Sequence, residues 1–345
     1  MNAPNSASPT LSGFSIGSIR IDPPVVLAPM SGVTDYPIRK QARRFGAGLV
    51  VSEMVACETL AQGREDVVRR MTGDADVAPR VIQLAGREAE WMRIGARIAE
   101  DAGAEIIDIN MGCPAKQVTR GLSGSALMRD LDHALTLIEA TVQAVETPVT
   151  LKMRLGWDHE TLNAPDLARR AEAAGVKMVT VHGRTRQQFY KGEADWSAVA
   201  AVKAAITIPV VVNGDIVDLG SARDALARSG ADGVMIGRAS QGRPWLPGAV
   251  ARALTGETQA VIEPSRAEAA ACLAEATEDA AILYDEALGV RCMRKHFASL
   301  ADWAESDPEK SRFWRGRLCR SRTVREALEG LDAFAEAGDG PAVAA

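Results

Sequence analysis

Paired cysteines, long apolar runs and aromatic side chains are all scarce in this sequence of 345 residues. The cysteines are five in number and no two form a C-x-x-C pair, so we expect neither a disulfide framework nor a structural zinc site. No apolar run approaches the roughly 20 residues that cross a bilayer. The N-terminus has neither the basic nor the apolar region of a signal peptide. We therefore expect a protein of the reducing cytoplasm, with no membrane partner and no bound metal.

Aromatic residues make up only 4% of the chain, whereas alanine, valine and glycine are abundant. This composition favours parallel strands and tightly packed helices over an antiparallel β-sandwich. The formal net charge of −5 argues against a surface that binds nucleic acid throughout. It does not exclude a local basic patch, because screening makes such patches act locally.

Eight short apolar runs recur along the chain, separated by stretches rich in Ala, Glu and Arg. They are 25–30, 49–54, 80–86, 105–112, 148–154, 177–184, 208–215 and 232–238. Their spacing, on the order of 25–30 residues, matches one strand–helix unit each and predicts an α/β fold of the (β/α)₈ TIM-barrel type. An open doubly wound sheet is the alternative. It is weakened because no G-x-G-x-x-G motif follows the first run.

Helix boundaries are predicted where a barrel needs them. Thr34 and Asp35 open one helix, and the periodic segments 87–102, 161–174 and 218–229 each stop at a glycine. The segment 253–265 is a candidate linker, after which only helical patterns follow. We predict a polar extension at 1–20, a barrel domain at 21–255, a small all-α domain at 262–335 and a disordered tail at 336–345.

Polar residues end the predicted strands, on the side of the barrel where enzymes of this fold carry their active sites. They are Glu53, Gln83, Asn110, Lys152, His182, Asn213 and Arg238, with Met30 after the first strand. Any single one is equally explained by a strand that exits into solvent, but the set favours a site. Gly214 and Gly237 follow the last two strands, at the usual phosphate site of such barrels. They imply a phosphorylated cofactor, unless they only make tight turns.

Three of these positions, and Cys113 after the fourth strand, carry more specific chemistry. Lys152 ends an apolar strand, where a cation is costly unless it meets an anion or an electron-rich group such as the N1/C2 edge of a flavin. Gln83 has the donor and the acceptor needed to bond a ring edge, and His182 either contacts the cofactor or is structural. Cys113 begins a loop rich in Gly, Ser and Thr that can close over a substrate and carry a proton donor. A lone cysteine is otherwise more often an inert buried thiol.

Several motifs in the correct order resemble the dihydrouridine synthase family, and within it the bacterial B-type group that includes proteins described as nitrogen-regulation proteins. The motifs are APMSGVTDYPIR (28–39), VSEM (51–54), IDINMGCPAKQVTRGLSGSALMRD (107–130), VTLKMRLGW (149–157), VHGRTR (181–186), NGDI (213–216) and IGRASQGRPW (236–245). The resemblance covers nearly the whole chain and lacks no functional position. The chain departs from the family in its acidic net charge and its longer polar ends.

The resemblance implies an FMN-dependent oxidoreductase that uses NADPH to reduce a uridine of tRNA to 5,6-dihydrouridine. FMN would be held by Pro29, Met30, Ser31, Gln83, Lys152, His182, Asn213, Gly214, Asp215, Gly237 and Arg238. Asn110, Arg154 and Tyr190 would face the uracil of a flipped-out uridine. Hydride would pass from flavin N5 to uracil C6, and Cys113 would protonate C5 from the opposite face. The subgroup points to U17 of the D-loop, and we expect a monomer.

The predicted C-terminal helices are rich in basic residues, with few acids among them. The basic residues are Arg291, Arg294, Lys295, Lys310, Arg312, Arg315, Arg317, Arg320, Arg322 and Arg325, and Phe297, Phe313 and Trp314 are interleaved. On the residues alone, a solvated helix face over core aromatics is the simpler explanation. Clustered arginine also suits phosphate contacts, and the family uses this domain to bind tRNA, so Arg315 and Arg322 are candidate tRNA contacts.

Two other functions remain open at this point. A small-molecule flavin enzyme resembling dihydroorotate dehydrogenase would share the barrel, the phosphate site and a rim cysteine, but it would not need the basic helices. A non-catalytic RNA-binding or regulatory protein would be expected to lack Lys152 or Cys113, and both are present. A flavin spectrum of the purified protein and a dihydroorotate oxidation assay separate these possibilities.

Overall fold

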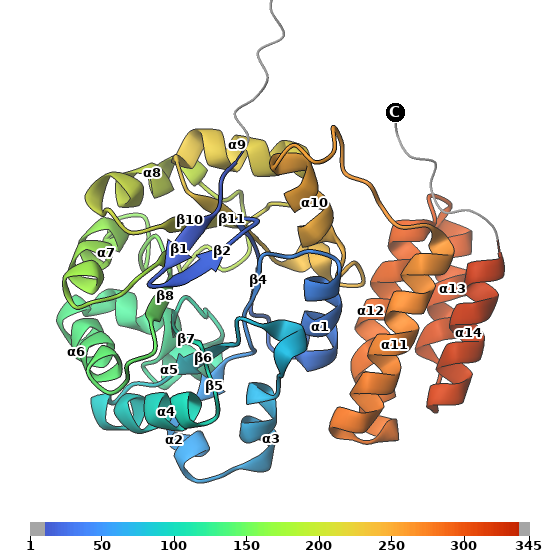
Figure 1. The fold of residues 1–345 in the computed structure, drawn as a ribbon, viewed down its shortest axis with the longest axis horizontal. Coiled ribbons are helices and arrows are strands. Elements are labelled where there is room, and N and C mark those ends of the chain that lie inside the picture. Colours follow the sequence, from blue (N-terminus) through green and yellow to red (C-terminus); the bar gives the residue numbers. More distant parts are fainter. Residues whose placement is uncertain (1–10, 338–345) are drawn as a thin grey trace, which may run out of the picture.

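A closed barrel of parallel strands forms the larger part of the structure, a computed structural model that describes residues 11–337 (Figure 1). Neighbouring strands follow the order β4-β3-β11-β10-β9-β8-β7-β6-β5. Their bounds are β3 Val25–Leu27, β4 Leu49–Val50, β5 Val55–Ala56, β6 Val81–Ala85, β7 Ile106–Met111, β8 Val149–Arg154, β9 Val179–His182, β10 Val210–Asn213 and β11 Gly233–Ile236. A parallel bridge between Val51 and Val81 joins the end of β4 to β6 and closes the ring.

Each of the eight predicted runs contains a strand, so the (β/α)₈ prediction is confirmed within residues 11–337. The second strand position differs from the prediction, because it is broken in two. β4 pairs with β3 and β5 pairs with β6, so the chain changes its main partner between Val51 and Val55.

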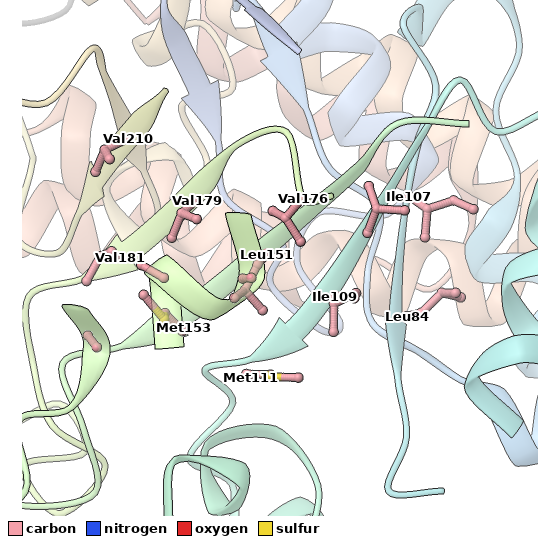
Figure 2. Close-up of a cluster of buried hydrophobic side chains, with 14 of the residues drawn as sticks. Leu84, Ile107, Ile109, Met111, Leu151, Met153, Val176, Val179, Val181 and Val210 are labelled. Atoms are coloured by element: carbon pink, nitrogen blue, oxygen red, sulfur yellow. The ribbon is translucent and has the colours of Figure 1, made fainter. Parts of the chain in front are cut away.

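Side chains alternate between the lumen and the outer helices along each strand, as the two-residue period requires. Ile109, Leu151 and Met153 belong to the buried cluster that packs the strands against the helices, part of which Figure 2 shows. The residues between them, such as Asn110 and Lys152, face the lumen and line the cavity described below. The alternation therefore places apolar residues outside and polar residues inside the upper barrel.

The opposite end of the lumen is apolar and is closed by a hairpin that the sequence did not indicate. β1 (Phe14–Ile16) and β2 (Ile19–Ile21) pair antiparallel and lie across the barrel in Figure 1. Phe14, Ile16 and Ile21 share a buried cluster with lumen residues such as Ile106 and Val211. The expectations for residues 1–10 and 338–345 lie outside the described residues, and the domain boundaries remain predictions.

Helices cover the outside of the barrel. They are α1 Tyr36–Arg44, α2 Cys57–Ala61, α3 Glu65–Val68, α4 Ala89–Asp101, α5 Lys116–Arg120, α6 Leu131–Val142, α7 Ala164–Ala173, α8 Trp196–Ala205, α9 Leu219–Ser229 and α10 Leu246–Leu254. Asp35 is the N-cap residue of α1. Gly103, Gly175 and Gly230, which follow α4, α7 and α9, have φ angles of 86°, 106° and 63°. Glycine enters this left-handed region without steric penalty, which is why these helices end where the sequence predicted.

Beyond residue 265 the described chain forms four helices with short connections and packs beside α1. The helices are α11 Arg266–Tyr284, α12 Glu286–Ala304, α13 Pro308–Cys319 and α14 Val324–Glu336. Their shared core, which includes Phe297 and Leu318, also contains Ile38 of α1 and Trp245 before α10. The predicted helical C-terminal region is thus confirmed, and it is joined to the barrel by apolar packing. Between residues 11 and 337, no helix is long and apolar enough to cross a membrane.

Candidate active site

A cavity of about 580 Å³ opens at the carboxyl ends of the barrel strands. Its volume is typical of cofactor sites, which run from roughly 300 to 1,000 Å³. The predicted cofactor residues all line it, namely Pro29, Met30, Ser31, Gln83, Lys152, His182, Asn213, Gly214, Asp215, Gly237 and Arg238. The four residues assigned to the acid and to the uracil, Asn110, Cys113, Arg154 and Tyr190, line it as well. The structure therefore brings fifteen predicted residues from separate loops and strands to one cavity.

Three predicted residues lie elsewhere. Glu53 is buried under the loop after β3, where its Oε1 accepts the N–H of Gly32 at 2.5 Å, and it does not line the cavity. Arg315 lies on α13 and Arg322 lies just before α14, both exposed. Among residues 11–337, no group of three or more His, Cys, Asp or Glu side chains is placed to hold a metal ion.

Gln83 and Asn110 are oriented by a buried hydrogen-bond chain in the lumen. Asn110 Nδ2 donates to Gln83 Oε1 at 2.7 Å, and Gln83 Nε2 donates to Asp108 Oδ2 at 2.7 Å. Thr150 Oγ1 donates to the other carboxyl oxygen of Asp108 at 2.6 Å. Burial raises the pKa of Asp108, but these two hydrogen bonds favour its ionised form. The chain leaves Gln83 with one N–H free to point toward a ligand.

Lys152 is a buried cation without an anionic hydrogen-bond partner among the described residues. Its Nζ donates to Asn213 Oδ1 at 3.2 Å, and Asn213 Nδ2 in turn donates to the carbonyl of Met235 at 2.8 Å. Burial, followed by the neighbouring Arg154, lowers the pKa of Lys152 to about 8. The side chain still carries a proton near neutral pH, so an electron-rich ligand in the cavity would complete its hydrogen bonding.

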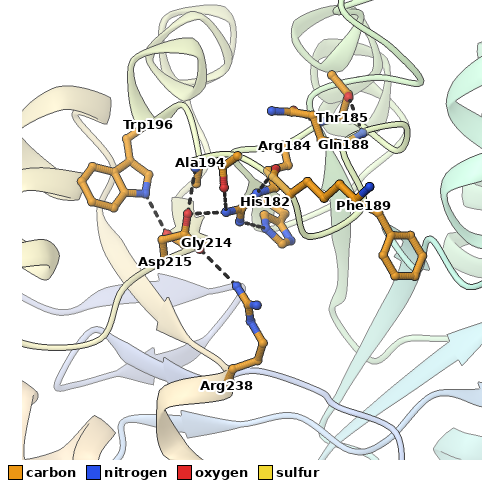
Figure 3. A network of polar contacts seen from close by, with 12 residues as sticks. His182, Arg184, Thr185, Gln188, Phe189, Ala194, Trp196, Gly214, Asp215 and Arg238 are labelled. Atoms are coloured by element: carbon orange, nitrogen blue, oxygen red, sulfur yellow. Dashed lines mark hydrogen bonds and ion pairs between the residues drawn. The ribbon is translucent and has the colours of Figure 1, made fainter.

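Asp215, which follows β10, organises two cations from the loops after β9 and β11 (Figure 3). Its carboxylate pairs with Arg184, which is buried, and with Arg238 at 3.1 Å, and it accepts the N–H of Ala194 at 2.9 Å. These bonds lower the pKa of Asp215 although its burial opposes them. His182 Nε2 lies 3.3 Å from Arg184 Nη1, and burial and the surrounding cations hold the pKa of His182 well below its usual value. His182 is therefore neutral, and Arg238 is held at the edge of the cavity.

Cys113 is held in place by the backbone around it. Its N–H donates to Asn110 Oδ1 at 3.0 Å, and its carbonyl accepts from the backbone and the hydroxyl of Ser125 at 3.1 and 2.9 Å. Arg154 Nε donates to the carbonyl of Gly112 at 2.8 Å. The same guanidinium donates to two carbonyls of the loop after β9. Arg154 thus ties the cysteine loop to that loop while it lines the cavity.

Exposed aromatic rings flank the mouth of the cavity. Tyr190 lies beside the guanidinium groups of Arg154 and Arg238, whose carbons are 5.6 and 5.2 Å from its ring centre. Phe189 packs edge-on against Tyr190 with ring centres 4.7 Å apart. Both rings are more than a third exposed. Exposed aromatic rings beside two cations at an open cavity are suited to contact with a flat ligand.

Sequence reasoning missed several contributors to this site. Val33, Met54, Ile216, Ala239 and Gln241 line the cavity without having been singled out. Met54 could have been found, because it directly follows the strand-end residue Glu53. The other four lie in loops or, for Ala239, in the three-residue 3₁₀ helix Arg238–Ser240, where no period marks which side chain turns inward. Arg184 was visible only as part of the VHGRTR motif, because its pairing with Asp215 joins two separate loops.

The basic C-terminal helices have a mixed role. Phe297 and Trp314 are buried in the helical core, so two of the three interleaved aromatics are structural, whereas Phe313 is 58% exposed. Arg315 pairs with Asp302 at 3.0 Å. Within residues 11–337, the side chain of Arg322 forms no ion pair. The C-terminal helices therefore carry exposed arginine side chains, but an acidic partner already neutralises the charge of Arg315.

Comparison with known proteins gives consistent matches. The family described as "Dihydrouridine synthase (Dus)" matches residues 26–338. A protein of Rhodobacter capsulatus named "Probable tRNA-dihydrouridine synthase" is 56% identical over 292 residues, which are 84% of this chain and 90% of the relative. A "tRNA-dihydrouridine synthase B" of Xanthomonas axonopodis pv. citri is 45% identical over 311 residues, 90% of this chain and 92% of the relative.

One solved structure supports the architecture. The histamine dehydrogenase from Rhizobium sp. 4-9 superposes with a TM-score of 0.56 and covers 95% of this chain. The matched region spans 64% of that protein, and the sequences are 13% identical. At this identity the likeness concerns the fold alone.

Proposed function

The chain belongs to the dihydrouridine synthase family, and from this premise we propose that it reduces uridine to 5,6-dihydrouridine in tRNA, using FMN and NADPH. The observation that carries the proposal is the convergence of the fifteen predicted site residues on one cavity. We further propose U17 of the D-loop as the target, in line with the B-type resemblance and with the relative from Xanthomonas. Nothing in the site favours a dihydroorotate dehydrogenase-like or a non-catalytic role.

The cavity suits FMN by its size and its donor set. The buried Lys152, whose one hydrogen-bond partner among residues 11–337 is an amide oxygen, would meet the electron-rich edge of an isoalloxazine ring. The free N–H of Gln83 would meet another ring edge. Gly214 and Gly237 border the cavity beside Arg238, where a phosphate would find a cation and closely approaching backbone. Bound FMN would supply the hydride for uracil C6 after its reduction by NADPH.

The residues of this chain would position the uracil and move the proton. Asn110 holds the backbone N–H groups of Gly112 and Cys113 and so sets where the thiol lies. The thiol would give its proton to uracil C5. Tyr190, beside the guanidinium groups of Arg154 and Arg238, would guide the flipped-out base into the cavity. Arg154 would brace the two loops through Nε and Nη1, which donate to three backbone carbonyls, and would offer the N–H groups of Nη2 to the base.

Two measurements test this function. The purified protein should be yellow and should release FMN on denaturation, and NADPH should bleach its spectrum. It should then restore dihydrouridine in tRNA from a strain that lacks the enzyme, at a position that nucleotide-resolution mapping identifies. A protein that is colourless and takes up no FMN would overturn the proposal. Cytoplasmic location and a monomeric state remain predictions.

A further inference from the structure

One helix outside the barrel, α12, bonds to both loops that border the mouth of the cavity. The first loop, residues 28–34, contributes Met30 and Val33 to the lining, and the second, residues 237–242, contributes Arg238 and Gln241. No residue of α12 lines the cavity itself. The helix therefore reaches the site only through these loops.

His296 of α12 joins the two loops through its two ring nitrogens. Nδ1 accepts the N–H of Gly242 at 3.1 Å, and Nε2 lies 3.1 Å from the carbonyl oxygen of Val33. Because a carbonyl can only accept, Nε2 carries the proton and Nδ1 does not. The side chain is 2% exposed, and burial, with Lys295 as the second cause, lowers its pKa to about 3. The neutral ring thus matches one donor and one acceptor at the same time.

Further bonds from the same part of α12 surround this histidine. Lys295 Nζ donates to the carbonyl of Gly32, and Gln241 Nε2 donates to Ser299 Oγ at 3.0 Å. Gly242 has a φ of 72°, and a Cβ at this position would lie 2.6 Å from the carbonyl oxygen of His296. The second loop can reach the helix only because residue 242 has no side chain.

α12 also contacts the segment that carries the basic surface. Arg294 Nη2 donates to the carbonyl of Ser321 at 2.9 Å, and Cys319 Sγ lies 3.2 Å from the carbonyl oxygen of Arg294. The connection between α13 and α14, which these bonds hold, also carries the exposed Arg320 and Arg322. One helix is therefore bonded to the loops of the cofactor site on one side and to the proposed tRNA surface on the other.

We propose that His296 is a positioning residue that makes the binding of FMN and the binding of tRNA cooperative. This inference rests on the proposed function. A cofactor in the cavity would fix the two loops in place, and tRNA on the basic surface would fix the helices. Because His296 ties the loops to the helices, either ligand would hold both elements in the arrangement that the other ligand binds. Each ligand then raises the affinity for the other by the same factor, since coupling between binding equilibria is reciprocal.

The test measures affinities of the full-length protein and not turnover. FMN is titrated into the apoprotein, with quenching of flavin fluorescence as the signal, in the absence and presence of saturating unmodified tRNA. In the wild type we expect tRNA to tighten FMN binding by about fivefold or more. In His296→Leu the ratio of the two dissociation constants should fall most of the way to one, because Lys295 and Ser299 still bond to the loops. tRNA binding by the apo form of this variant should be unchanged.

A matched control separates His296 from the docking of the helices in general. Lys40 of α1 pairs with Asp279 of α11 at 3.0 Å, so Lys40→Ala removes a bond of the same interface without touching either loop. Lys40→Ala should keep the wild-type ratio of the FMN dissociation constants without and with tRNA. His296→Gln, which retains a donor and an acceptor, and Ser299→Ala, which removes one supporting bond, should give intermediate ratios. These two variants decide the question if His296→Leu does not fold.

The outcomes distinguish the inference from the function. The wild type could bind FMN and form dihydrouridine, yet have the same FMN dissociation constant with and without tRNA. This result would contradict the inference and would not affect the proposed function. Equal loss of coupling in Lys40→Ala and His296→Leu would also overturn it, since docking alone would then be responsible. Failure of the wild type to bind FMN would remove both.

Discussion

Cys113 is positioned through its backbone, so its side chain can be changed without releasing the loop. Asn110 and Ser125 bond only to its N–H and its carbonyl. Cys113→Ala should therefore retain FMN, whereas turnover should fall by roughly 10²–10⁴-fold, the usual contribution of a general acid. The measurement is dihydrouridine formation in tRNA by protein whose flavin is already reduced, with the flavin content determined in parallel.

Cys292→Ala provides the matched control, because Cys292 is another half-buried free cysteine and does not line the cavity. It should turn over at the wild-type rate. Wild-type rates in Cys113→Ala as well would refute the acid role of the thiol.

Asp35 predicts a pH dependence of stability. Burial, and then the charge of Glu53, raise its pKa to about 6, although Tyr284 Oη donates to it at 3.1 Å. A group whose pKa is raised in the folded state contributes stability that is complete below its unfolded pKa of 3.8 and is lost as pH rises through 6. Asp35→Asn should therefore raise stability at pH 7 by up to about 3 kcal/mol, with no gain at pH 4.

Thermal unfolding of both proteins at pH 4, 5, 6 and 7 measures this difference. Asp332→Asn, at an exposed position of α14, makes the same chemical change away from any buried charge and should give parallel curves. A constant difference between Asp35→Asn and the wild type across this range would show that Asp35 does not titrate in it.

The site residues that stand at the ends of strands and follow a two-residue period could be predicted from the sequence. Gln83, Asn110 and Lys152 alternate with apolar residues on buried strands, so their sequence neighbours already indicate that they face the lumen. His296 could not be found in this way. Its partners Gly242 and Val33 are 54 and 263 residues away in the chain, and on its helix it looks like any buried residue.

At the scale of elements, the length of a strand or helix decided whether the sequence could predict it. The longer strands and the helices that end at Gly103, Gly175 and Gly230 were predictable, because several residues share one period or one terminating signal. The hairpin β1–β2 has strands of three residues, too short for alternation to stand out from a polar segment. The break between β4 and β5 has no local signal, since it depends on which neighbour each half pairs with.

Arg266 holds the ends of three C-terminal helices together. At the start of α11, its Nε donates to the carbonyl of Phe334 at 2.5 Å, and its Nη1 pairs with Glu305 at 2.6 Å. Arg266→Leu would leave the half-buried carboxylate of Glu305 and the carbonyl of Phe334 without this partner. We expect the unfolding free energy to fall by about 3 kcal/mol.

Urea unfolding followed by circular dichroism measures this decrease. Arg325→Leu removes a guanidinium that is 85% exposed and 4.0 Å from Glu329, and it should change the unfolding free energy by no more than about 0.5 kcal/mol. Equal midpoints for the two variants would mean that Arg266 does not clamp the helices.

At the scale of the whole molecule, an acidic chain carries a concentrated basic segment. Residues 310–325 contain seven basic residues and no acidic one, although the net charge of the chain is −5. Because screening limits the reach of charge to about 10 Å at ordinary salt, this segment can attract phosphate while the rest of the surface does not. Affinity for tRNA should therefore fall steeply with salt, in proportion to the number of phosphates that the protein neutralises.

Neutralising Arg315 and Arg322 together should weaken tRNA binding about uniformly across tRNA sequences. It should also reduce the slope of log affinity against log salt by about 1 for each phosphate that is no longer neutralised. Arg322→Gln alone should have the larger effect, because Arg315 is already paired with Asp302. Arg93→Gln with Arg169→Gln makes the same change of charge on α4 and α7 of the barrel. The basic segment is not the tRNA surface if the substitutions on the barrel lower the slope as much as neutralising Arg315 and Arg322 does. The same conclusion follows if tRNA binding does not respond to salt.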